Sequence, residues 1–514
     1  MHYKRHQYKP RILLPADGKV SGFYCFPSYS LNTVNSPMFP RATYDSSLLI
    51  LLTGCMVIIM INVINPLRAE EKTLHHASKI KTFTDDKLPT QQKNAASTYG
   101  LERLYQMAKD FDKNVRMAAY QAEAAGYALK KNKGVLLPQV DIYASGKIYD
   151  TKQPYEENYT GTDYQLNVTQ PLFQAEALYN KNLAEVAVHR EQLNYRIALK
   201  NLAMQLASAY FAILKQENLL ISLQAEEAAL QNQFSGAQLS FAAGTLSVVD
   251  LADIEAQYRA LAARRIAQNN TLKSFYDGLS NMIGQQLDHL PYPEHIKLEG
   301  LRLQKNLHDF IQIVNEQNLE LLQEKLAMQV QKIQYSRAKS AHYPELQLEA
   351  SHQFSKRDDH LAVTQSTEYV EMSTLGISFH LPIYHGGSIS AHADQQQALL
   401  RKQIAIWEQK KLEAEETARQ RFREHEALWD MIAANKRWFD AAEKSYQATQ
   451  SGFASNTRNQ TDLLNAQSKL FAAQRDYIAT QYDLIINSIE LSSLSGTLDA
   501  DFLQLLEKVI SIKQ

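Results

Sequence analysis

The feature that most constrains this chain is a run of 64 residues, Ser388 to Ser451, that contains neither glycine nor proline. Alanine, glutamine, glutamate, lysine, arginine and leucine dominate it, and these residues favour the α-helix. Such a helix would extend about 95 Å at about 1.5 Å per residue, which exceeds the width of a compact domain. A second run of similar length, Ala175 to Ser235, lies earlier in the chain. Two rods of this kind are typical of a coiled coil, a repeat or a membrane-associated rod rather than an enzyme core.

Residues 1–69 have the composition of a leader. A basic region precedes the apolar run from Leu48 to Ile64, and Pro-Leu-Arg-Ala follows shortly after it. We predict an export signal that is cleaved after Ala69. One alternative is an uncleaved membrane anchor, although the run is shorter than the roughly 20 residues of a spanning helix. Another is acylation at Cys55, which follows Leu-Thr-Gly.

The basic region of the leader is unusually long, and translation from Met38 instead of Met1 would give a more ordinary signal. Both cysteines, Cys25 and Cys55, lie in the leader. A mature chain without thiols has neither a disulfide framework nor a cysteine metal site. Residues 70–98 lack periodicity and are rich in lysine, glutamine and serine, which predicts an extended segment.

The chain contains an internal duplication. Phe241, Gly244 and Asp250 align with Phe453, Asn456 and Asp462 at a constant offset of 212 residues. Upstream, Pro171 pairs with Pro382 at 211 and Pro138 with Pro344 at 206, so the length differences fall between the paired prolines. We predict a first repeat over residues 99–284, a linker over 285–306, a second repeat over 307–496 and a C-terminal tail over 497–514.

Each repeat is expected to hold a first helix, two strands, a long helix, a tight turn and a shorter helix. The first helices are predicted over residues 101–133 and 308–340, and the last over 248–283 and 461–494. The expected strands alternate apolar and polar side chains, and they are centred on Ile142 to Ala144, Tyr164 to Val168, Leu346 to Ala350 and Leu375 to Leu381. Polar loops over residues 149–162 and 355–370 would close them into two hairpins.

The four strands allow two interpretations. They could form a small sheet packed on a helical core, or they could face lipid. Four strands cannot close a transmembrane barrel, and an open edge cannot face lipid, so a membrane location requires several chains.

The first rod carries an imperfect heptad stripe that predicts packing against other rods. Its two apolar positions are occupied by Val186, Leu193, Ala207, Leu214 and Ile221, and by Ile197, Met204 and Phe211. The stripe is interrupted by Arg190, Lys200 and Asn218.

Three motifs carry a resemblance to a known family. Leu-Pro-Ile-Tyr-His-Gly-Gly at residues 381–387 joins a strand to a rod and is similar to the junction signature of the TolC-like outer-membrane efflux factors. Gln-Pro-Leu-Phe at 170–173 resembles its counterpart in the other repeat, and the segment from Phe241 to Leu251 resembles the family's helix tip. The match covers about residues 99–500.

This resemblance implies a mainly α fold with a small β part. Three chains would contribute four strands each to a twelve-stranded outer-membrane barrel of a Gram-negative bacterium. Their long antiparallel helices would form a coiled-coil barrel, a tunnel through the periplasm. The homotrimer would contact outer-membrane lipid, a periplasmic adaptor protein and an inner-membrane pump, and would conduct drugs or secreted polypeptides passively.

The two tip turns are the candidate docking sites for the adaptor. Gly244 can adopt the left-handed conformation that ends a helix, and asparagine is its commonest substitute there. Ser247 with Asp250, and Asn459 with Asp462, have the spacing of N-caps and their acidic partners. The resemblance assigns docking to Gly244, Thr245 and Leu246, and to Asn456, Thr457 and Arg458.

The strand-to-helix junctions are expected at Pro171, Pro382, Gly386 and Gly387. Relatives often close the tunnel with acids near the tip, but Gln447 and Gln450 occupy the expected positions, so Asp440 and Glu443 become the candidate lumen acids. The alternative is that these two acids are solvated flanks of the rod.

The chain has no recognisable catalytic or cofactor motif. Six histidines lie within about 50 residues, but their spacing suits a polar surface better than a metal site: His342, His352, His360, His380, His385 and His392. No basic stripe for nucleic acid is present. We therefore expect a non-enzymatic conduit without cofactor or metal, and the alternative is a membrane-anchored periplasmic coiled-coil scaffold.

Overall fold

The computed structural model describes residues 100–151, 157–291, 293–359, 367–455 and 457–512. All of them belong to one compact unit, Ala95–Gln514. The predicted leader, the segment over residues 70–98 and Asn456 lie outside the described residues.

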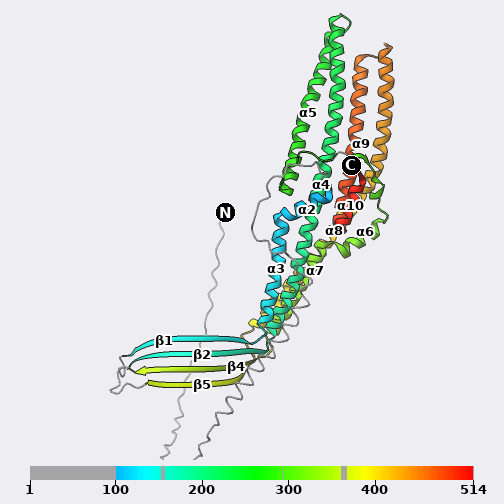
Figure 1. Cartoon of the computed structure of the whole chain (residues 1–514). Helices are drawn as coiled ribbons and strands as arrows, with labels where there is room; N and C mark the ends of the chain where they lie inside the picture. The colour runs from blue at the N-terminus through cyan, green and yellow to red at the C-terminus, as the bar shows by residue number, and fades with distance from the viewer. Residues whose placement is uncertain (1–99, 152–156, 292, 360–366, 456, 513–514) are drawn as a thin grey trace, which may run out of the picture. The chain divides into compact units, whose positions relative to one another are not determined.

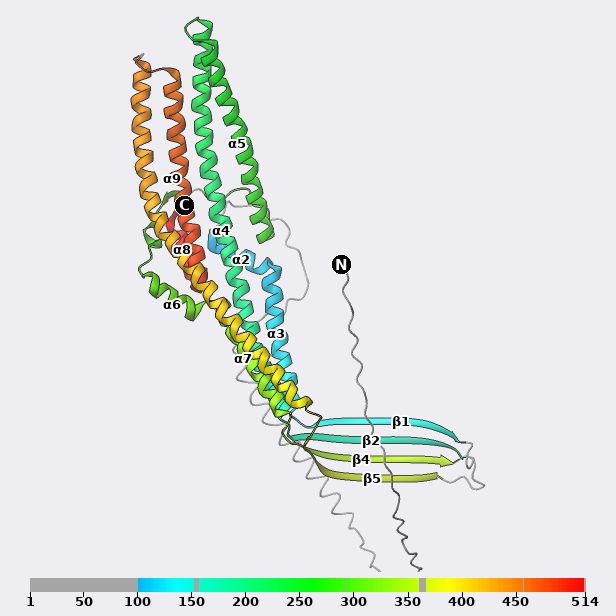
Figure 2. The ribbon, with the colours of Figure 1, turned by 180° about the vertical axis from the view of Figure 1, so that it is seen from behind.

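Two long helical hairpins dominate the unit. The outgoing helices are α4 (Ala175–Ala242, 68 residues) and α8 (Ser388–Ala454, 67 residues), so both predicted rods form. They return as α5 (Val248–Ile283) and α9 (Gln460–Leu494). The turns of both hairpins lie at the same end of the unit, and the sheet lies at the other end (Figures 1 and 2).

The first helix expected in each repeat is instead two helices. These are α2 (Leu101–Phe111) with α3 (Lys113–Gly134), and α6 (Leu307–Gln317) with α7 (Leu319–Ser340). Asp112 and Asn318 separate them with extended backbone, and the side chain of each accepts a hydrogen bond from the third residue of the next helix. The prediction of single helices was wrong because an N-cap residue interrupts each one.

The four predicted strands form one antiparallel sheet in the order β1-β2-β4-β5. The strands are β1 (Gln139–Thr151), β2 (Glu157–Phe173), β4 (Glu345–Asp359) and β5 (Thr367–His380). The two hairpins are confirmed, and β2 pairs with β4 to join them. The strands extend well into the predicted loops because backbone pairing continues where the side chains become polar.

The predicted linker and tail carry structure of their own. The linker contains β3 (Pro293–Ile296) and the short 3-10 helix η2 (Leu298–Leu301). The tail contains α10 (Ala500–Val509) and β6 (Ile510–Ile512), and β6 pairs with β3. The two segments therefore meet, although they are distant in the sequence.

The main hydrophobic core lies where α2, α4, α5, α9 and α10 meet. At its centre Tyr210, Phe211 and Leu214 of α4 are fully buried. Part of α4 is apolar and long enough to cross a membrane, but half of that part is buried within the unit, as in a core helix.

Most of the predicted heptad stripe is buried or half-buried, and Ala207, Phe211 and Leu214 lie in the main core. Two of the polar interruptions are satisfied, because Lys200 pairs with Glu320 of α7 and Asn218 donates to the Tyr482 hydroxyl of α9 at 2.8 Å. Ile221 departs from the prediction, since 47% of it is exposed.

Candidate functional site

The sheet has one apolar and one polar face. Residues paired directly across antiparallel strands share a face, so the register aligns Ile142, Leu166 and His352 in one row and Val168, Ala350 and Leu375 in another. Large apolar side chains on this face are exposed: Ile142 is 77% exposed, Leu375 66% and Ile377 65%. An exposed apolar surface of this extent indicates a site of contact with lipid or protein.

The opposite face of the sheet carries polar and charged side chains. Asp163 accepts hydrogen bonds there from Ser145 of β1 and Ser355 of β4, which hold its carboxylate between the two neighbouring strands. Ser378 donates to the Glu349 carboxylate at 3.0 Å on the same face. This face is suited to water, because its side chains are mainly polar, Glu349 is exposed and Asp163 is half-buried and hydrogen-bonded.

The predicted junction residues lie at the boundary between sheet and rods. Pro171 is near the end of β2, where the register with β4 shifts, and a strand tolerates proline at such an irregularity. Pro382 follows β5, and Gly386 and Gly387 then adopt φ angles of 59° and 79°. Both angles lie in the left-handed region that favours glycine, so the second junction turns the chain from the strand into α8.

The first tip turn has the predicted geometry. Gly244 has φ 75°, and the backbone N–H and hydroxyl of Thr245 both donate to the Ser240 carbonyl at 2.9 Å. Ser247 caps α5 by accepting from the Asp250 N–H at 3.1 Å, and its own hydroxyl donates to the Asp250 carboxylate. Leu246 packs against the apolar cluster beneath the turn. The tip is therefore held rigidly by its own hydrogen bonds.

The second tip turn repeats this pattern. The N–H and hydroxyl of Thr457 donate to the Gly452 carbonyl at 2.9 and 3.0 Å. Asn459 and Asp462 form the predicted capping box at the start of α9, and Arg458 pairs with Asp462 at 3.8 Å. The expected left-handed residue, Asn456, lies outside the described residues.

A cavity of about 640 Å³ lies between the two tips. The first hairpin lines it with Ser240, Thr245 and Leu246, and the second with Phe453 and Asn459. Residues of both tips therefore line one groove.

The candidate lumen acids, Asp440 and Glu443, lie on the surface of the single chain, on α8. Asp440 pairs with Lys436 at 2.7 Å, and this hydrogen bond raises the pKa of the lysine. The Lys436 ammonium also lies over the rings of Phe439 and Tyr477, at 5.2 and 5.7 Å. Glu443 is exposed.

The sequence did not reveal the ion pairs that join the two hairpins. Lys215 of α4 lies 2.6 Å from Asp483 of α9, and Glu226 of α4 pairs with Arg475 of α9. Since these partners are 268 and 249 residues apart, no local pattern could identify them.

A half-buried carboxyl, that of Glu217, lies between α4, α5 and the linker. Tyr276 donates its hydroxyl to Glu217 and accepts from the Leu290 N–H at 2.9 Å. Burial raises the pKa of Glu217, and the hydrogen bond from Tyr276 and the charge of His289 oppose that shift. The linker is thereby attached to both helices.

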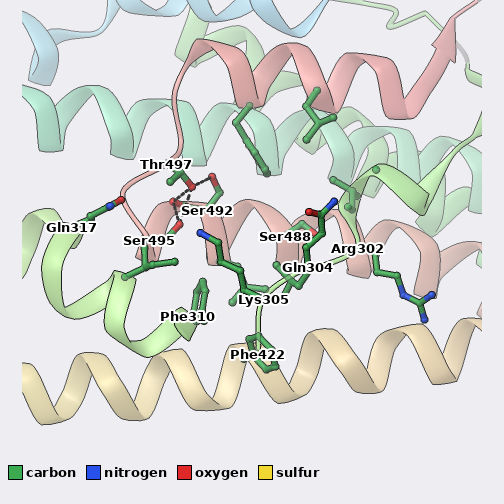
Figure 3. Close-up of a pocket in the computed structure, with 17 residues that line it drawn as sticks. Arg302, Gln304, Lys305, Phe310, Gln317, Phe422, Ser488, Ser492, Ser495 and Thr497 are labelled. Carbon is green, nitrogen blue, oxygen red and sulfur yellow. Dashed lines mark hydrogen bonds between the residues drawn. The ribbon is translucent and has the colours of Figure 1, made fainter. Parts of the chain in front are cut away.

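A smaller cavity of about 290 Å³ lies between the linker, α6, α8, α9 and the start of the tail (Figure 3). The hydroxyls of Ser492, Ser495 and Thr497 on one wall bond to one another, at 3.1 and 2.8 Å. Phe310 and Phe422 form an apolar wall. These hydroxyls are already paired with one another, and Arg302, Gln304 and Lys305 add polar groups to the lining.

Within the described residues, no group of three or more histidine, cysteine, aspartate or glutamate side chains is arranged to hold a metal ion. Of the histidines noted in the sequence, His360 lies outside the described residues. His352 instead contacts Ser373 at 2.9 Å and Glu371 at 3.6 Å on the sheet.

Long helical hairpins joined to a sheet with an exposed apolar face define an outer-membrane conduit of the mixed helix and strand type. The sequence profile of the outer membrane efflux protein family matches residues 104–285 and 310–497, more than two thirds of the chain. The chain belongs to this family.

Individual relatives agree with this assignment. The chain is 25% identical over 399 residues to outer membrane protein TolC of Vibrio cholerae, covering 77% of this chain and 91% of the relative. It is 25% identical over 438 residues to the proteases secretion protein PrtF of Dickeya chrysanthemi, covering 80% and 91%. The crystal structure of VceC from Vibrio cholerae has the same fold, with a TM-score of 0.67 at 14% identity, covering 77% of this chain and 96% of VceC.

The protein is therefore a TolC-like channel component of the Gram-negative outer membrane, with a large periplasmic part. Its family consists of channel proteins rather than enzymes.

Proposed function

We propose that three copies of this chain close a twelve-stranded barrel in the outer membrane and a helical tunnel in the periplasm. The trimer conducts substrates passively from an inner-membrane pump and an adaptor protein to the cell exterior. The duplicated order of elements gives each chain two similar hairpins, so that six hairpins surround the tunnel.

The two edges of the sheet are the main support for this proposal. In the described part of the chain, β1 and β5 are paired on one side only. Unpaired backbone groups cannot face hydrocarbon, and a strand edge invites pairing with another strand. Joining β5 of one copy to β1 of the next would satisfy both edges, leaving the apolar face toward lipid and the polar face toward the lumen.

The helices also support assembly. Five of the 67 residues of α8 are buried in the single chain, against 21 of the 68 residues of α4. Large apolar side chains on α8 are exposed, among them Leu412, Met431 and Trp438. A rod of this length gains stability by packing its apolar stripe, so neighbouring copies are the natural partners of α8. In such a tunnel Asp440 and Glu443 would line the lumen near the tip.

The tips supply the proposed adaptor site. Thr245 and Leu246 line the groove together with Phe453 and Asn459 of the second hairpin. Gly244, Thr457 and Arg458 belong to the same two turns. These turns are exposed, rigidly capped and farthest from the sheet (Figure 1). A helical hairpin of an adaptor would fit a groove between two helical hairpins by packing side chains into it.

Two classes of cargo remain as proposals. TolC and the efflux protein BepC of Brucella suis are named as outer membrane proteins, whereas PrtF is named for protease secretion. We therefore propose export of small toxic compounds or type I secretion of polypeptides. A pull-down that identifies the associated pump would separate the two.

A cysteine cross-linking experiment tests the proposed trimer. Ser145→Cys on β1 is combined in turn with Val370→Cys, Met372→Cys or Thr374→Cys on β5, to allow for different registers between copies. Two strands separate β1 from β5 within a chain, so their backbones are about 14 Å apart at about 4.8 Å per strand spacing. A disulfide cannot bridge that distance, so any cross-link must join two copies.

The expected result is covalent dimers and trimers in at least one register, none in the single-cysteine variants, and conductance of the purified trimer in a planar bilayer. The alternative is a periplasmic scaffold whose sheet packs on protein. A monomer that is soluble without detergent, with no cross-link in any register, would establish that alternative.

A further inference from the structure

His425 of α8 lies in a buried polar cluster that the channel function does not require. Its side chain is 2% exposed. Nδ1 lies 3.2 Å from Oδ1 of Asn487 on α9, and Nε2 lies 3.1 Å from the indole Nε1 of Trp429, one turn along α8. Both ring nitrogens therefore have partners.

The partners determine the protonation state of the imidazole. The indole N–H can only donate, so Nε2 of His425 must be the unprotonated acceptor. The Asn487 amide nitrogen donates to the Arg421 carbonyl at 3.3 Å, which directs its oxygen toward the ring. Nδ1 then carries the proton and donates to that oxygen, so the structure accommodates the neutral ring in one tautomer.

The cluster joins three separate parts of the chain. His425 and Trp429 belong to α8, Asn487 belongs to α9, and the Leu301 backbone at the end of η2 also bonds to the imidazole. The Arg302 guanidinium lies 5.4 Å from the centre of the Trp429 ring. Trp429 packs against the main core, so its position is coupled to the linker and to both helices.

We propose that His425 is a pH-sensitive switch that holds α8 against α9 and the linker only while its imidazole is neutral. A proton on Nε2 would face the indole N–H, which is itself a donor. Two donors cannot share a hydrogen bond, so protonation displaces Trp429 and loosens the contact between α8 and residues 301–302.

The groups around the ring set the direction of the response. Burial lowers the pKa of His425 below its ordinary value of 6.5, while Asn487, Leu301 and the charge of Glu426 oppose the shift. The switch therefore acts as the pH falls below 6.5.

Four other charged side chains lie near the cluster among the described residues: Arg302, Arg421, Glu424 and Glu490. The Arg302 guanidinium lies over the ring of Trp429, and Arg421 is paired with Glu490 of α9 at 3.0 Å and with Glu424. Burial raises the pKa of Glu490. Its titration has to be separated from that of His425.

Tryptophan fluorescence provides the test. The chain has three tryptophans, Trp407, Trp429 and Trp438. Trp407→Phe with Trp438→Phe leaves Trp429 as the only indole in the full-length protein, purified from membranes in detergent. We expect its emission to shift to longer wavelength as the pH is lowered from 8 to 4, with a midpoint below 6.5, because the indole becomes more exposed.

Two variants of the cluster make the test specific. His425→Gln should abolish the transition. Asn487→Asp should move the midpoint upward by about one to three pH units, because a carboxylate beside the imidazole stabilises its charged form. Asn487→Asp is expected to shift the midpoint of the transition and not to abolish the transition. Its result is therefore informative even if His425→Gln fails to fold.

His392→Gln and Glu490→Gln are the matched controls. His392 is an exposed histidine on the same helix, and the second variant removes the nearby titrating acid. Both should leave the midpoint unchanged. A transition that persists in His425→Gln, that follows Glu490, or that does not move upward in Asn487→Asp would overturn the proposal. An emission of Trp429 that does not change between pH 8 and 4 would also overturn the proposal.

Discussion

Replacing Leu375 by arginine tests which face of the sheet contacts lipid. Leu375 lies on β5 midway between Phe379 and Glu371, about 14 Å along the strand from each at about 3.4 Å per residue. This places it near the centre of the exposed apolar face. Arginine at the midplane on the lipid face of a barrel costs about 2–4 kcal/mol. A trimer carries the substitution three times, so the expected loss is about 6–12 kcal/mol per assembled barrel.

Thr374→Arg is the matched control, one residue away on the polar face. Its side chain hydrogen-bonds to Ser351 at 2.6 Å, so the change removes one hydrogen bond between exposed side chains. The expected cost is about 0.5–1.5 kcal/mol per chain. Thr374→Arg should therefore still assemble.

Urea titration of each protein folded into lipid vesicles measures the difference, with trimer formation followed by gel migration. Leu375→Arg should lower the urea midpoint strongly or prevent insertion, and Thr374→Arg should retain both insertion and conductance. Equal effects of the two variants, or a larger effect at Thr374, would refute the assignment of the faces.

Three further variants test the helical part. Gly496→Ala should destabilise the fold by about 1–3 kcal/mol in thermal unfolding, because Gly496 has φ 72° and an added Cβ would lie 2.5 Å from the carbonyl oxygen of Gln317, beside the turn after α9 (Figure 3). Gly278→Ala, at an uncrowded helical position, should be neutral or stabilising. Glu217→Gln should raise stability at pH 7 and make it less dependent on pH. The raised pKa of Glu217 means that wild-type stability increases as pH falls toward 4.5 and decreases as pH rises through the folded-state value. Denaturation between pH 4.5 and 7.5 should show this slope in the wild type alone.

Local features were predictable from the sequence. The caps at Ser247 and Asn459 depend on hydrogen bonds to residues three positions away, and Gly244 needs only its own backbone conformation. The breaks at Asp112 and Asn318 were missed, although a signal was available. These residues are 206 positions apart, the same offset as Pro138 and Pro344, and both types are preferred N-caps.

The candidate site was predictable only in part. Alternation along each strand indicated one apolar and one polar face, since side chains point to opposite sides of a strand in turn. The groove between the tips needed the positions of both hairpins, and the cluster at His425 needed Asn487 from another helix. Neither arrangement can be predicted from the residue pattern of a single segment.

The sequence by itself determined the rods, the strand faces and the turns, because each depends on residues within a few positions of one another. Only the tertiary structure decided that β2 pairs with β4, that β3 pairs with β6, and that ion pairs join α4 to α9. The physical reason is that many segments could form such contacts equally well by local preference. Their choice depends on the simultaneous packing of all the helices around one core.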